Sequence, residues 1–403
     1  MSSLFADRRN RLIAACSPGD VIIVPSNTMA VRNSDVEYDF RQDSDFFFLT
    51  GFDEPDSTLV LCPGRDDEQV LLFVRPRDPA AETWTGRRAG VEGAVADHGA
   101  DKAWEHKDFD TELARVLEGA NRVGYTLGRD AVRDQRVIAL ARRHRLQPRL
   151  GVEGPDLIFD PQAIVHELRL FKTVAEVDAL RRAGQISAEG HHEAMRLCEP
   201  GMTEYAVQAG MEYVFRAAGS PRVGYSSIVA SGDNATILHY NTNRMTVPEG
   251  SLVLIDAGAE VDYHSADITR TFPASGTFTA PQRAVYEVVL ESQEAAIAAC
   301  VAGTSYMTVH EVARRRLVEG MVDLGLLEGS VDELIETEAF QRYFMHKTGH
   351  WLGMDVHDVG RYRVDGSWRV LEAGMVLTVE PGIYIPANDD QAPAALRGIG
   401  VRI

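Results

Sequence analysis

The sequence has few cysteines and no long apolar run. Its 403 residues include only four cysteines, and no two of them form a C-x-x-C pair. Such scattered cysteines argue against a disulfide framework and favour reduced thiols. No segment approaches the run of about 20 apolar residues that a membrane helix requires. The N-terminal stretch MSSLFADRRNRLIAAC also lacks the apolar core of a signal peptide. These absences predict a cytoplasmic protein that does not enter a membrane.

The sequence is also short of positive charge. It has 41 Lys and Arg residues against 60 Asp and Glu residues, which gives a formal net charge of −19. A protein whose main role is to bind nucleic acid needs a basic surface, so this balance argues against a nucleic-acid partner. The remaining composition is ordinary for a globular chain, with 45% apolar and 25% charged residues. The length allows two or three domains.

The first part of the chain alternates between strand-like and helical segments. Four apolar runs, VIIVP, STLVLCP, QVLLFV and RVGYTL, are typical of buried strands. Between and after them lie helical, Arg-rich segments such as AVRDQRVIALARRHRL. This alternation predicts an α/β domain over residues 1–165, where the pattern breaks near a proline.

The second part begins with a clear helix signal. Thr173 and Glu176 form the capping box T-V-A-E, and the helix that they open should run to about Cys198. Two further capping boxes, T-A-P-Q at Thr279 and T-V-H-E at Thr308, predict two more helices. Strand-like blocks lie between and after these helices. We therefore predict an α+β domain over residues 174–403, in which helices flank a curved, mostly antiparallel sheet.

Three carboxylates stand where apolar strands end. Asp256 follows the apolar run 251–255, Asp267 interrupts the next strand-like block, and Glu380 follows the apolar run 375–379. A buried carboxylate is costly unless it is paired, protonated or bound to a metal. Any one of these acids alone is more often a turn or cap residue. Three of them in the same structural context favour a shared metal site.

A histidine in a glycine-flanked loop completes this set. His350 lies in the segment KTGHWLG of the same C-terminal part. Oxygen-rich donors with one imidazole suit manganese, cobalt, iron or zinc better than a metal that prefers thiolates. Several shared carboxylates can also hold two ions about 3.5 to 4 Å apart, an arrangement that activates a water molecule and polarises a carbonyl.

Five blocks in this order resemble a known family. They are ILHYNTNR, VLIDAGAEVDYHSADITRTF, MHKTGHWLGMDVHDVG, VLTVEPGIYIP and RGIGVRI. Together they resemble the pita-bread metallopeptidases, and among these the aminopeptidase P (Xaa-Pro aminopeptidase) family, with prolidase as a close relative. The N-terminal segments SDVEYDFRQDSDFFFLTGFDEPDS and TWTGRR resemble the bacterial type of this family. The resemblance covers nearly the whole chain and implies a creatinase-like N-terminal domain before the pita-bread domain.

The resemblance implies a role for each of the four candidate ligands. Asp256 would be the bidentate ligand of one metal ion, and Asp267 would bridge two ions. His350 would bind the second ion. Glu380 would join its ligands and act as the general base for a bridging water. The implied cofactor is a pair of divalent ions, with Mn²⁺ expected and Co²⁺ or Zn²⁺ as alternatives.

Five further residues match positions near the family's site. His239, His346 and His357 match histidines that contact the scissile carbonyl and the proline and that shuttle protons. Without the family, a structural histidine is at least as common at each position. Arg402 and Tyr384 match residues that orient the ligating carboxylates by hydrogen bonds. Core packing is the alternative for Tyr384.

Two features concern assembly and the end of the sequence. Trp84 matches a residue that reaches the active site of a neighbouring subunit, which implies a homo-oligomer, dimer or tetramer; taken alone, a tryptophan is more often buried in a core. The family ends its last block with G-x-R-x-E, whose Glu is a fifth ligand. The sequence reaches Arg402 and Ile403, so that Glu would be the next residue. We expect it either to lie beyond a truncated end or to have been lost.

The activity implied by the resemblance is hydrolysis of the bond between an N-terminal residue and a following proline, by a metal-bridging hydroxide. Prolidase activity on Xaa-Pro dipeptides is the nearest alternative. A non-catalytic pita-bread binding protein is the alternative outside the enzymes, and only the missing fifth carboxylate favours it. Creatinase is disfavoured because Asp256, Asp267, His350 and Glu380 are all present.

Overall fold

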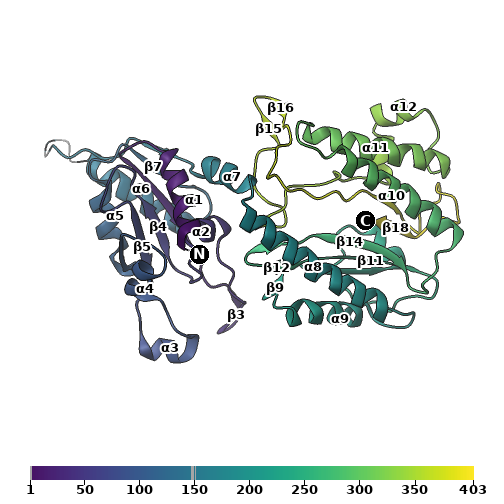
Figure 1. Ribbon diagram of the computed structural model, residues 1–403, viewed down its shortest axis with the longest axis horizontal. Helices are drawn as coiled ribbons and strands as arrows, with labels where there is room; N and C mark the ends of the chain where they lie inside the picture. The colour runs from purple at the N-terminus through teal and green to yellow at the C-terminus, as the bar shows by residue number, and fades with distance from the viewer. Residues whose placement is uncertain (1, 147–148, 150) are drawn as a thin grey trace. The chain divides into compact units, whose positions relative to one another are not determined.

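The computed structural model describes residues 2–146, 149 and 151–403, and the chain forms two compact units, Met1–Leu168 and Arg169–Ile403 (Figure 1). The first unit is built on a six-stranded sheet in the order β6-β5-β4-β1-β7-β8. Its strands are β1 (Asp20–Pro25), β4 (Thr58–Leu61), β5 (Val70–Val74), β6 (Lys102–Glu105), β7 (Arg122–Gly124) and β8 (Leu157–Phe159). Strands β1, β7 and β8 run parallel, β5 runs parallel to β6, and β4 runs antiparallel to β1 and β5.

Helices and one small hairpin complete the first unit. The helices are α1 (Ser2–Ala14), α2 (Ser44–Thr50), α3 (Pro79–Thr85), α4 (Gly90–Ala96), α5 (Phe109–Leu117), α6 (Ala131–Arg145) and α7 (Gln162–Leu170), and the hairpin pairs β2 (Val31–Asn33) with β3 (Val36–Glu37). The apolar side chains of the central strands form the core with α5 and α6, where Phe73, Leu113 and Val137 are buried. The four predicted strands and the Arg-rich helix are all confirmed.

The second unit contains four small antiparallel sheets. They are β10 (Ile228–Ser231) with β11 (Leu252–Ala257) and β14 (Ile268–Pro273); β9 (Arg222–Val223) with β12 (Ala259–Val261) and β13 (His264–Ser265); β15 (Arg363–Val364) with β16 (Ser367–Trp368); and β17 (Gly382–Ile385) with β18 (Ile399–Arg402). Its helices are α8 (Val174–Leu197), α9 (Glu204–Ala217), α10 (Ala280–Ala299), α11 (Tyr306–Asp323) and α12 (Val331–Glu336). Short 3-10 turns are η1 (His106–Asp108) in the first unit, and η3 (Gly232–Thr236) and η4 (Ala339–Arg342) in the second.

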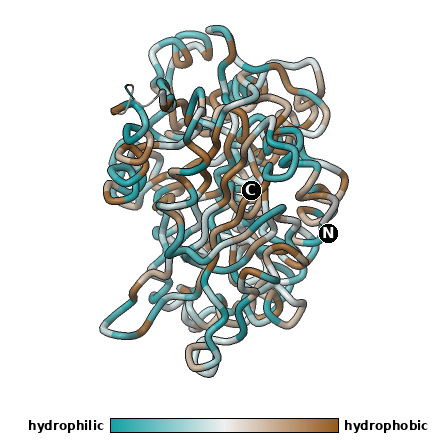
Figure 2. The backbone as a smooth tube through the Cα atoms, turned by 90° about the vertical axis from the view of Figure 1, so that its left-hand side faces the viewer, coloured by the Kyte–Doolittle hydropathy of each residue, from teal (hydrophilic) through white to brown (hydrophobic). Residues whose placement is uncertain are grey.

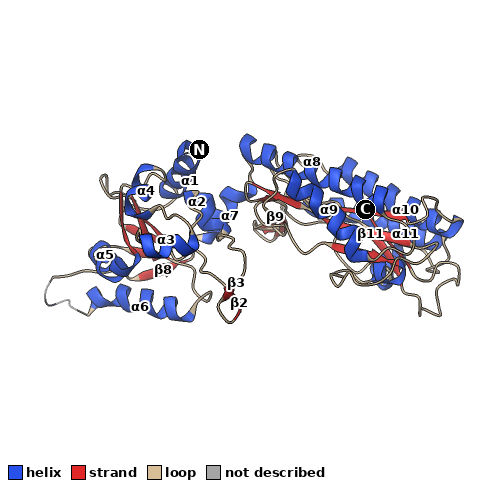
Figure 3. Ribbon diagram, turned by 90° about the horizontal axis from the view of Figure 1, so that it is seen from below, coloured by secondary structure: helices blue, strands red, loops and turns tan. Residues whose placement is uncertain are grey.

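Two groups of buried side chains hold the helices of the second unit against its strands. Helices α8 and α9 contribute Ile186 and Phe215 to a core with Val253 and Ile255 of β11. Helices α10 and α11 form a second core with β17 and β18. Figure 3 shows helices alongside the strands of this unit, and Figure 2 shows that apolar and hydrophilic stretches alternate along the chain. The predicted α+β layout is confirmed.

The helix starts test the capping predictions. The boxes at Thr173 and Thr279 are both present, with the threonine hydroxyl and the side chain three residues later each accepting a backbone N–H. The third predicted helix is present, but its predicted cap is wrong, because α11 begins at Tyr306 and Thr308 lies in its first turn. Ser305 comes earlier in the chain and already caps this helix by accepting the N–H of Met307.

The segment 375–379 also departs from its prediction. It is not a regular strand, and its only bridge in the described chain joins Trp351 to Leu377. It is nevertheless extended and bonded to the neighbouring loop, since the N–H of Leu352 donates to the carbonyl of Val376 and the N–H of Thr378 donates to the carbonyl of His350. Within the described residues, every helix is too short or too polar to cross a membrane.

Candidate active site

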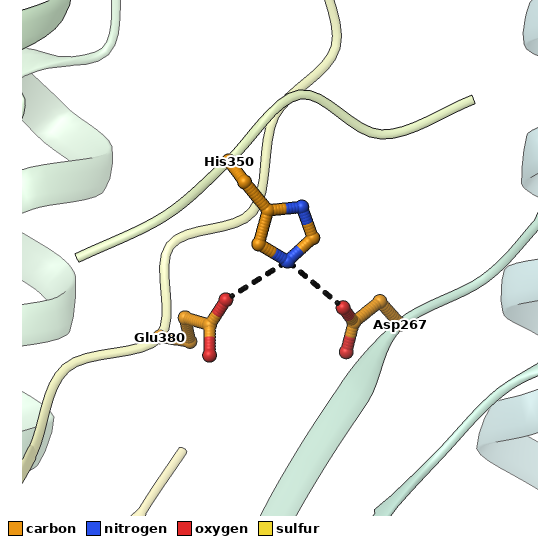
Figure 4. Close-up of side chains that lie close together, drawn as sticks. All are labelled: Asp267, His350 and Glu380. Atoms are coloured by element: carbon orange, nitrogen blue, oxygen red, sulfur yellow. Dashed lines mark ion pairs between the residues drawn. The ribbon is translucent and has the colours of Figure 1, made fainter. Parts of the chain in front are cut away.

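Three predicted ligands meet in the second unit. His350 Nε2 lies 3.3 Å from Asp267 Oδ2 and 3.2 Å from Glu380 Oε1, and the two dashed lines of Figure 4 mark these pairs. The donor atoms of the three residues lie within 4.8 Å of one another, and no other such group of His, Cys, Asp and Glu is found in the described part of the chain. The three side chains come from segments far apart in the sequence, so the fold assembles the cluster.

Two extended segments place His350 and Glu380 together. The N–H of Thr378 donates to the carbonyl of His350 over 2.9 Å, and the N–H of Glu380 donates to the carbonyl of Thr348 over 2.7 Å. The Thr378 hydroxyl joins the same two residues. It accepts the N–H of His350 at 3.0 Å and donates to Glu380 Oε1 at 2.9 Å. Thr378 therefore ties the Glu380 carboxylate to the backbone of His350 through one hydroxyl group.

A close approach of two backbones brings Asp256 near Asp267. Asp256 lies in β11 and pairs with Thr269 of β14, and Asp267 directly precedes β14. At Gly258 a Cβ atom would lie 1.8 Å from the carbonyl oxygen of Ala266, which no side chain can tolerate. Glycine at this position allows the two strands to approach at the point where each carries a carboxylate.

The hydrogen bonds of His350 fit a metal ligand. Its Nδ1 lies 2.9 Å from the carbonyl oxygen of Trp351, an acceptor, so Nδ1 carries the proton of the neutral ring. Nε2 then points a lone pair at the carboxylates of Asp267 and Glu380. This arrangement is repulsive unless a cation or a proton lies between them. Burial alone would lower the pKa of His350, but the two carboxylates raise it to about 10. Two carboxylates and one imidazole are a donor set that suits a divalent transition metal.

Asp256 is held by a phenol and a guanidinium. Tyr225 Oη contacts Asp256 Oδ1 and lies 3.0 Å from Asp267 Oδ1, and Arg402 Nη2 pairs with Asp256 Oδ2. Burial raises the pKa of Asp256, Arg402 opposes this shift, and Asp267 adds to it. One phenolic hydrogen cannot serve both carboxylates, so the pair retains negative charge that a cation can neutralise.

The remaining predicted residues fall into two groups. His346 Nε2 accepts from Tyr384 Oη over 2.7 Å, and Tyr384 Oη also lies 3.4 Å from Arg402 Nη1, which links these three in one hydrogen-bonded row. Burial lowers the pKa of His346 and raises that of Tyr384. The ring of His357 lies edge-on to that of His350, with 4.2 Å between centroids. Burial, and then the charge of His350, lowers the pKa of His357.

Two cavities open at the cluster. The residues that line both are His239, His350, His357, Glu380 and Arg402. The aromatic cavity, of about 510 Å³, adds Tyr306, Met307, Tyr362 and Trp368. The acidic cavity, of about 280 Å³, adds Tyr225, Asn241, Asp256 and Asp267. A molecule bound across the cluster could therefore extend into an apolar space on one side and a polar, negatively charged space on the other.

Two predicted residues, Tyr384 and Trp84, line neither cavity. Tyr384 is buried, whereas Trp84 lies near the end of α3 in the first unit and is 89% exposed. The core-packing interpretation of Trp84 is therefore wrong.

Sequence reasoning missed Tyr225 and Thr378. Thr378 stands two residues before Glu380 in an extended segment, so the two side chains share a face, and that spacing was a usable signal. Tyr225 had no local signal. It precedes β10, and the pairing of Ile228 with Asp256 brings it to the cluster.

Comparison with known proteins gives matches over both units. A model of metallopeptidase family M24 matches residues 178–403, and a model of the aminopeptidase P N-terminal domain matches residues 5–124. The chain is 43% identical over 400 residues to the Xaa-Pro aminopeptidase of Escherichia coli strain K12, covering 99% of this chain and 90% of that protein. It is 36% identical over 388 residues to human Xaa-Pro aminopeptidase 3, covering 95% of this chain and 75% of that protein.

Solved structures match as well. The structure of Pseudomonas aeruginosa aminopeptidase PepP aligns with a TM-score of 0.98 and 47% identity, over 100% of this chain and 91% of that one. Zinc-substituted E. coli aminopeptidase P in complex with product aligns with a TM-score of 0.96 and 42% identity, over 100% of this chain and 91% of that one.

Proposed function

Because the chain belongs to metallopeptidase family M24 and, across nearly all of its length, to the Xaa-Pro aminopeptidases, we propose that it releases the N-terminal residue from peptides whose second residue is proline. The observation that carries the proposal is the convergence of Asp267, His350 and Glu380 at the meeting point of two cavities. A hydrolase of this family needs such a centre, and the described side chains supply its donors.

The proposed cofactor is a pair of divalent ions, Mn²⁺ in the first place and Co²⁺ or Zn²⁺ as alternatives. Asp256, Asp267, His350 and Glu380 would hold them. The donor set supports this, because carboxylate oxygens with one imidazole nitrogen suit these metals. When bound, such ions lower the pKa of a water molecule and polarise a carbonyl oxygen.

Glu380 is the proposed general base. Burial alone would raise its pKa, but in the absence of a bound cation the hydrogen bond from a protonated His350 and the charge of Arg402 lower it, so the carboxylate is ionised near neutral pH. An ionised carboxylate in the shared wall of two cavities can accept a proton from an attacking water. Thr378 orients that carboxylate through its hydroxyl.

His239 and His357 are the proposed substrate contacts. Both side chains are exposed, and both line the two cavities, so they are accessible to a peptide that lies across the cluster. His346, which lines the aromatic cavity, is proposed as a third histidine on the substrate side, and with Tyr384 and Arg402 it forms one hydrogen-bonded row. We assign that row the task of holding Asp256 and the wall of the aromatic cavity in place.

The aromatic cavity supports recognition of proline. An Xaa-Pro bond has no N–H and a fixed φ, so a site identifies it by the shape of the ring rather than by backbone pairing. Tyr306, Tyr362 and Trp368 give an apolar surface next to His350 and Glu380 that suits such a ring.

Further parts of the proposal concern organisation. We assign residues 1–165 to an N-terminal α/β domain and 174–403 to the catalytic domain, which the two compact units and the two family matches support. A homo-oligomer, dimer or tetramer, is proposed, with Trp84 reaching a neighbouring subunit. The exposure of Trp84 supports this contact. A cytoplasmic location is supported by the four free cysteines.

A peptide panel tests the proposed activity. Metal-loaded protein is incubated with an Xaa-Pro-Xaa tripeptide, the matched Xaa-Ala-Xaa tripeptide and the Xaa-Pro dipeptide, and release of the first residue is followed by mass spectrometry. We expect cleavage of the proline tripeptide at a kcat/KM at least about tenfold above the other two. Preference for the dipeptide would identify a prolidase. Absence of any cleavage by folded, metal-loaded protein would favour a binding protein.

A further inference from the structure

A buried ionic cluster adjoins the candidate active site. Asp358 directly follows His357, and its carboxylate accepts two cationic side chains. Arg169 Nη2 lies 2.6 Å from Asp358 Oδ1, and Lys172 Nζ lies 2.9 Å from Asp358 Oδ2. The side chains are 3%, 2% and 1% exposed for Arg169, Lys172 and Asp358 respectively. Arg169 also pairs with Asp355 over 2.7 Å.

The two cations come from the start of the second unit. Arg169 is near the end of α7, and Lys172 lies between α7 and α8, where its backbone N–H donates to the carbonyl of Gly374 over 2.8 Å. Gly353 makes room for the cluster. A Cβ atom there would lie 2.1 Å from Asp358 Oδ2 and 3.0 Å from Lys172 Cε. The active-site loop is thus built around this ion pair.

Asp358 closes the loop that joins two active-site histidines. Its N–H donates to the carbonyl of Trp351 over 2.9 Å, and its Oδ1 lies 3.4 Å from the N–H of Asp355. The loop therefore begins beside His350 and ends beside His357. The 4.2 Å contact between the two histidine rings depends on where this closure is fixed.

Stability alone does not explain such a cluster. Charges out of water are expensive, and well-packed apolar side chains often replace a buried ion pair at no loss of stability. None of the three residues, Arg169, Lys172 and Asp358, lines either cavity of the site. The cluster does fix the direction of Asp358, the residue next to His357, because its carboxylate accepts from Arg169, from Lys172 and from the N–H of Asp355.

We propose that Asp358, held by Arg169 and Lys172, is a positioning residue that sets the His357 ring against the metal centre. This inference rests on the proposed function and deepens it. In this proposal, the segment just before α8 controls the position of a histidine that contacts the substrate.

A double-mutant cycle tests the proposal. Asp358→Asn, His357→Ala and the double variant are assayed for kcat and KM on the Xaa-Pro-Xaa tripeptide, with metal content and thermal unfolding measured on each. We expect Asp358→Asn to lower kcat by about 10- to 100-fold with full metal content. The double variant should match His357→Ala within about twofold, because Asp358 acts through His357.

The matched control is Asp389→Asn. Asp389 is also buried and paired with an arginine, Arg342, whose Nε lies 3.0 Å from Asp389 Oδ2, and it lines neither cavity. This variant should keep the wild-type kcat. If Asp358→Asn fails to fold, Lys172→Met enters the same cycle, since it removes one of the two cations and leaves Arg169 in place.

Three results would overturn the proposal: unchanged kcat in Asp358→Asn, unchanged kcat in His357→Ala, or losses that multiply in the double variant. A readout independent of turnover separates this failure from failure of the proposed function. In zinc-loaded protein with nitrogen-labelled histidine, the ring resonances of His357 should shift or broaden in Asp358→Asn and stay unchanged in Asp389→Asn. If the His357 resonances are unchanged in Asp358→Asn, the positioning role is refuted, whether or not the wild type cleaves the tripeptide.

Discussion

Replacement of Gly258 by alanine should separate the strands that carry Asp256 and Asp267. The new Cβ would lie 1.8 Å from the carbonyl oxygen of Ala266 and 3.2 Å from the backbone nitrogen of Asp267. Real Cβ contacts are essentially never below 3.0 Å, so the backbones must part by about 1.2 Å at this point (3.0 minus 1.8). The clash is with backbone atoms, which cannot rotate away as a flexible side chain can.

The size of the effect follows from that displacement. Disturbing the surroundings that hold metal ligands in place costs about 10- to 100-fold in metal affinity, and overpacking of a core costs about 1 to 3 kcal/mol. We therefore expect Gly258→Ala to bind Mn²⁺ about 10- to 100-fold more weakly. Its Tm should fall by about 2 to 12 °C, at roughly 2 to 4 °C per kcal/mol for a unit of this size.

A second glycine in the same unit gives the control. A Cβ at Gly184, inside α8, meets no atom within 4 Å. Gly184→Ala should keep the metal affinity and raise the Tm by about 1 to 4 °C, because alanine favours a helix over glycine by about 0.5 to 1 kcal/mol. Calorimetric metal titration and thermal unfolding measure both variants. Wild-type affinity and Tm in Gly258→Ala would refute the steric argument.

Three further predictions concern histidines. His350→Ala should lose bound metal and turnover while its circular dichroism stays that of the folded wild type; normal metal content and activity would remove His350 from the ligand set. His239→Ala should keep its metal and lower kcat by at least about tenfold, since His239 lines both cavities and is not in the ligand cluster; unchanged kinetics would assign it a structural role. Burial lowers the pKa of His191 from 6.5 to about 4, so the unfolded chain binds more protons between these values. The stability that neutral His191 provides is complete above pH 6.5 and is lost as the pH falls towards 4, by roughly 3 kcal/mol at most. His191→Asn should show a smaller loss in urea unfolding between pH 7 and 4.5, and an equal loss would contradict the assignment.

The elements that could be predicted are those with strong local signals. The capping boxes at Thr173 and Thr279 needed only four adjacent residues, and the apolar run before Asp256 identified β11 without any knowledge of its partners. The box at Thr308 failed because Ser305 offers the same chemistry a few residues earlier, and local pattern does not rank two competing caps. The segment before Glu380 was expected to be a strand. It is extended, but it pairs only with an irregular loop, which its apolar composition could not reveal.

The residues of the site also divide into those with a local signal in the sequence and those without one. Acids at the ends of apolar segments are anomalous by themselves, so Asp267 and Glu380 could be singled out from the sequence. Tyr225 reaches the cluster through the pairing of β10 with β11, and Lys172 reaches Asp358 across a large separation in sequence. These contacts depend on the tertiary arrangement, and no local pattern in the sequence predicts them. Trp84 could be interpreted either as core or as contact, and only its exposure in the folded unit removes the first interpretation.

The account as a whole depends on a metal centre at Asp267, His350 and Glu380 that cleaves before proline. The most direct test is release of the N-terminal residue from an Xaa-Pro-Xaa tripeptide by metal-stripped protein, before and after addition of Mn²⁺, alongside Glu380→Gln treated in the same way. We predict no release without metal, restored release with Mn²⁺ in the wild type, and a kcat at least about 100-fold lower in Glu380→Gln. Release that needs no metal, or that survives unchanged in Glu380→Gln, would contradict the account.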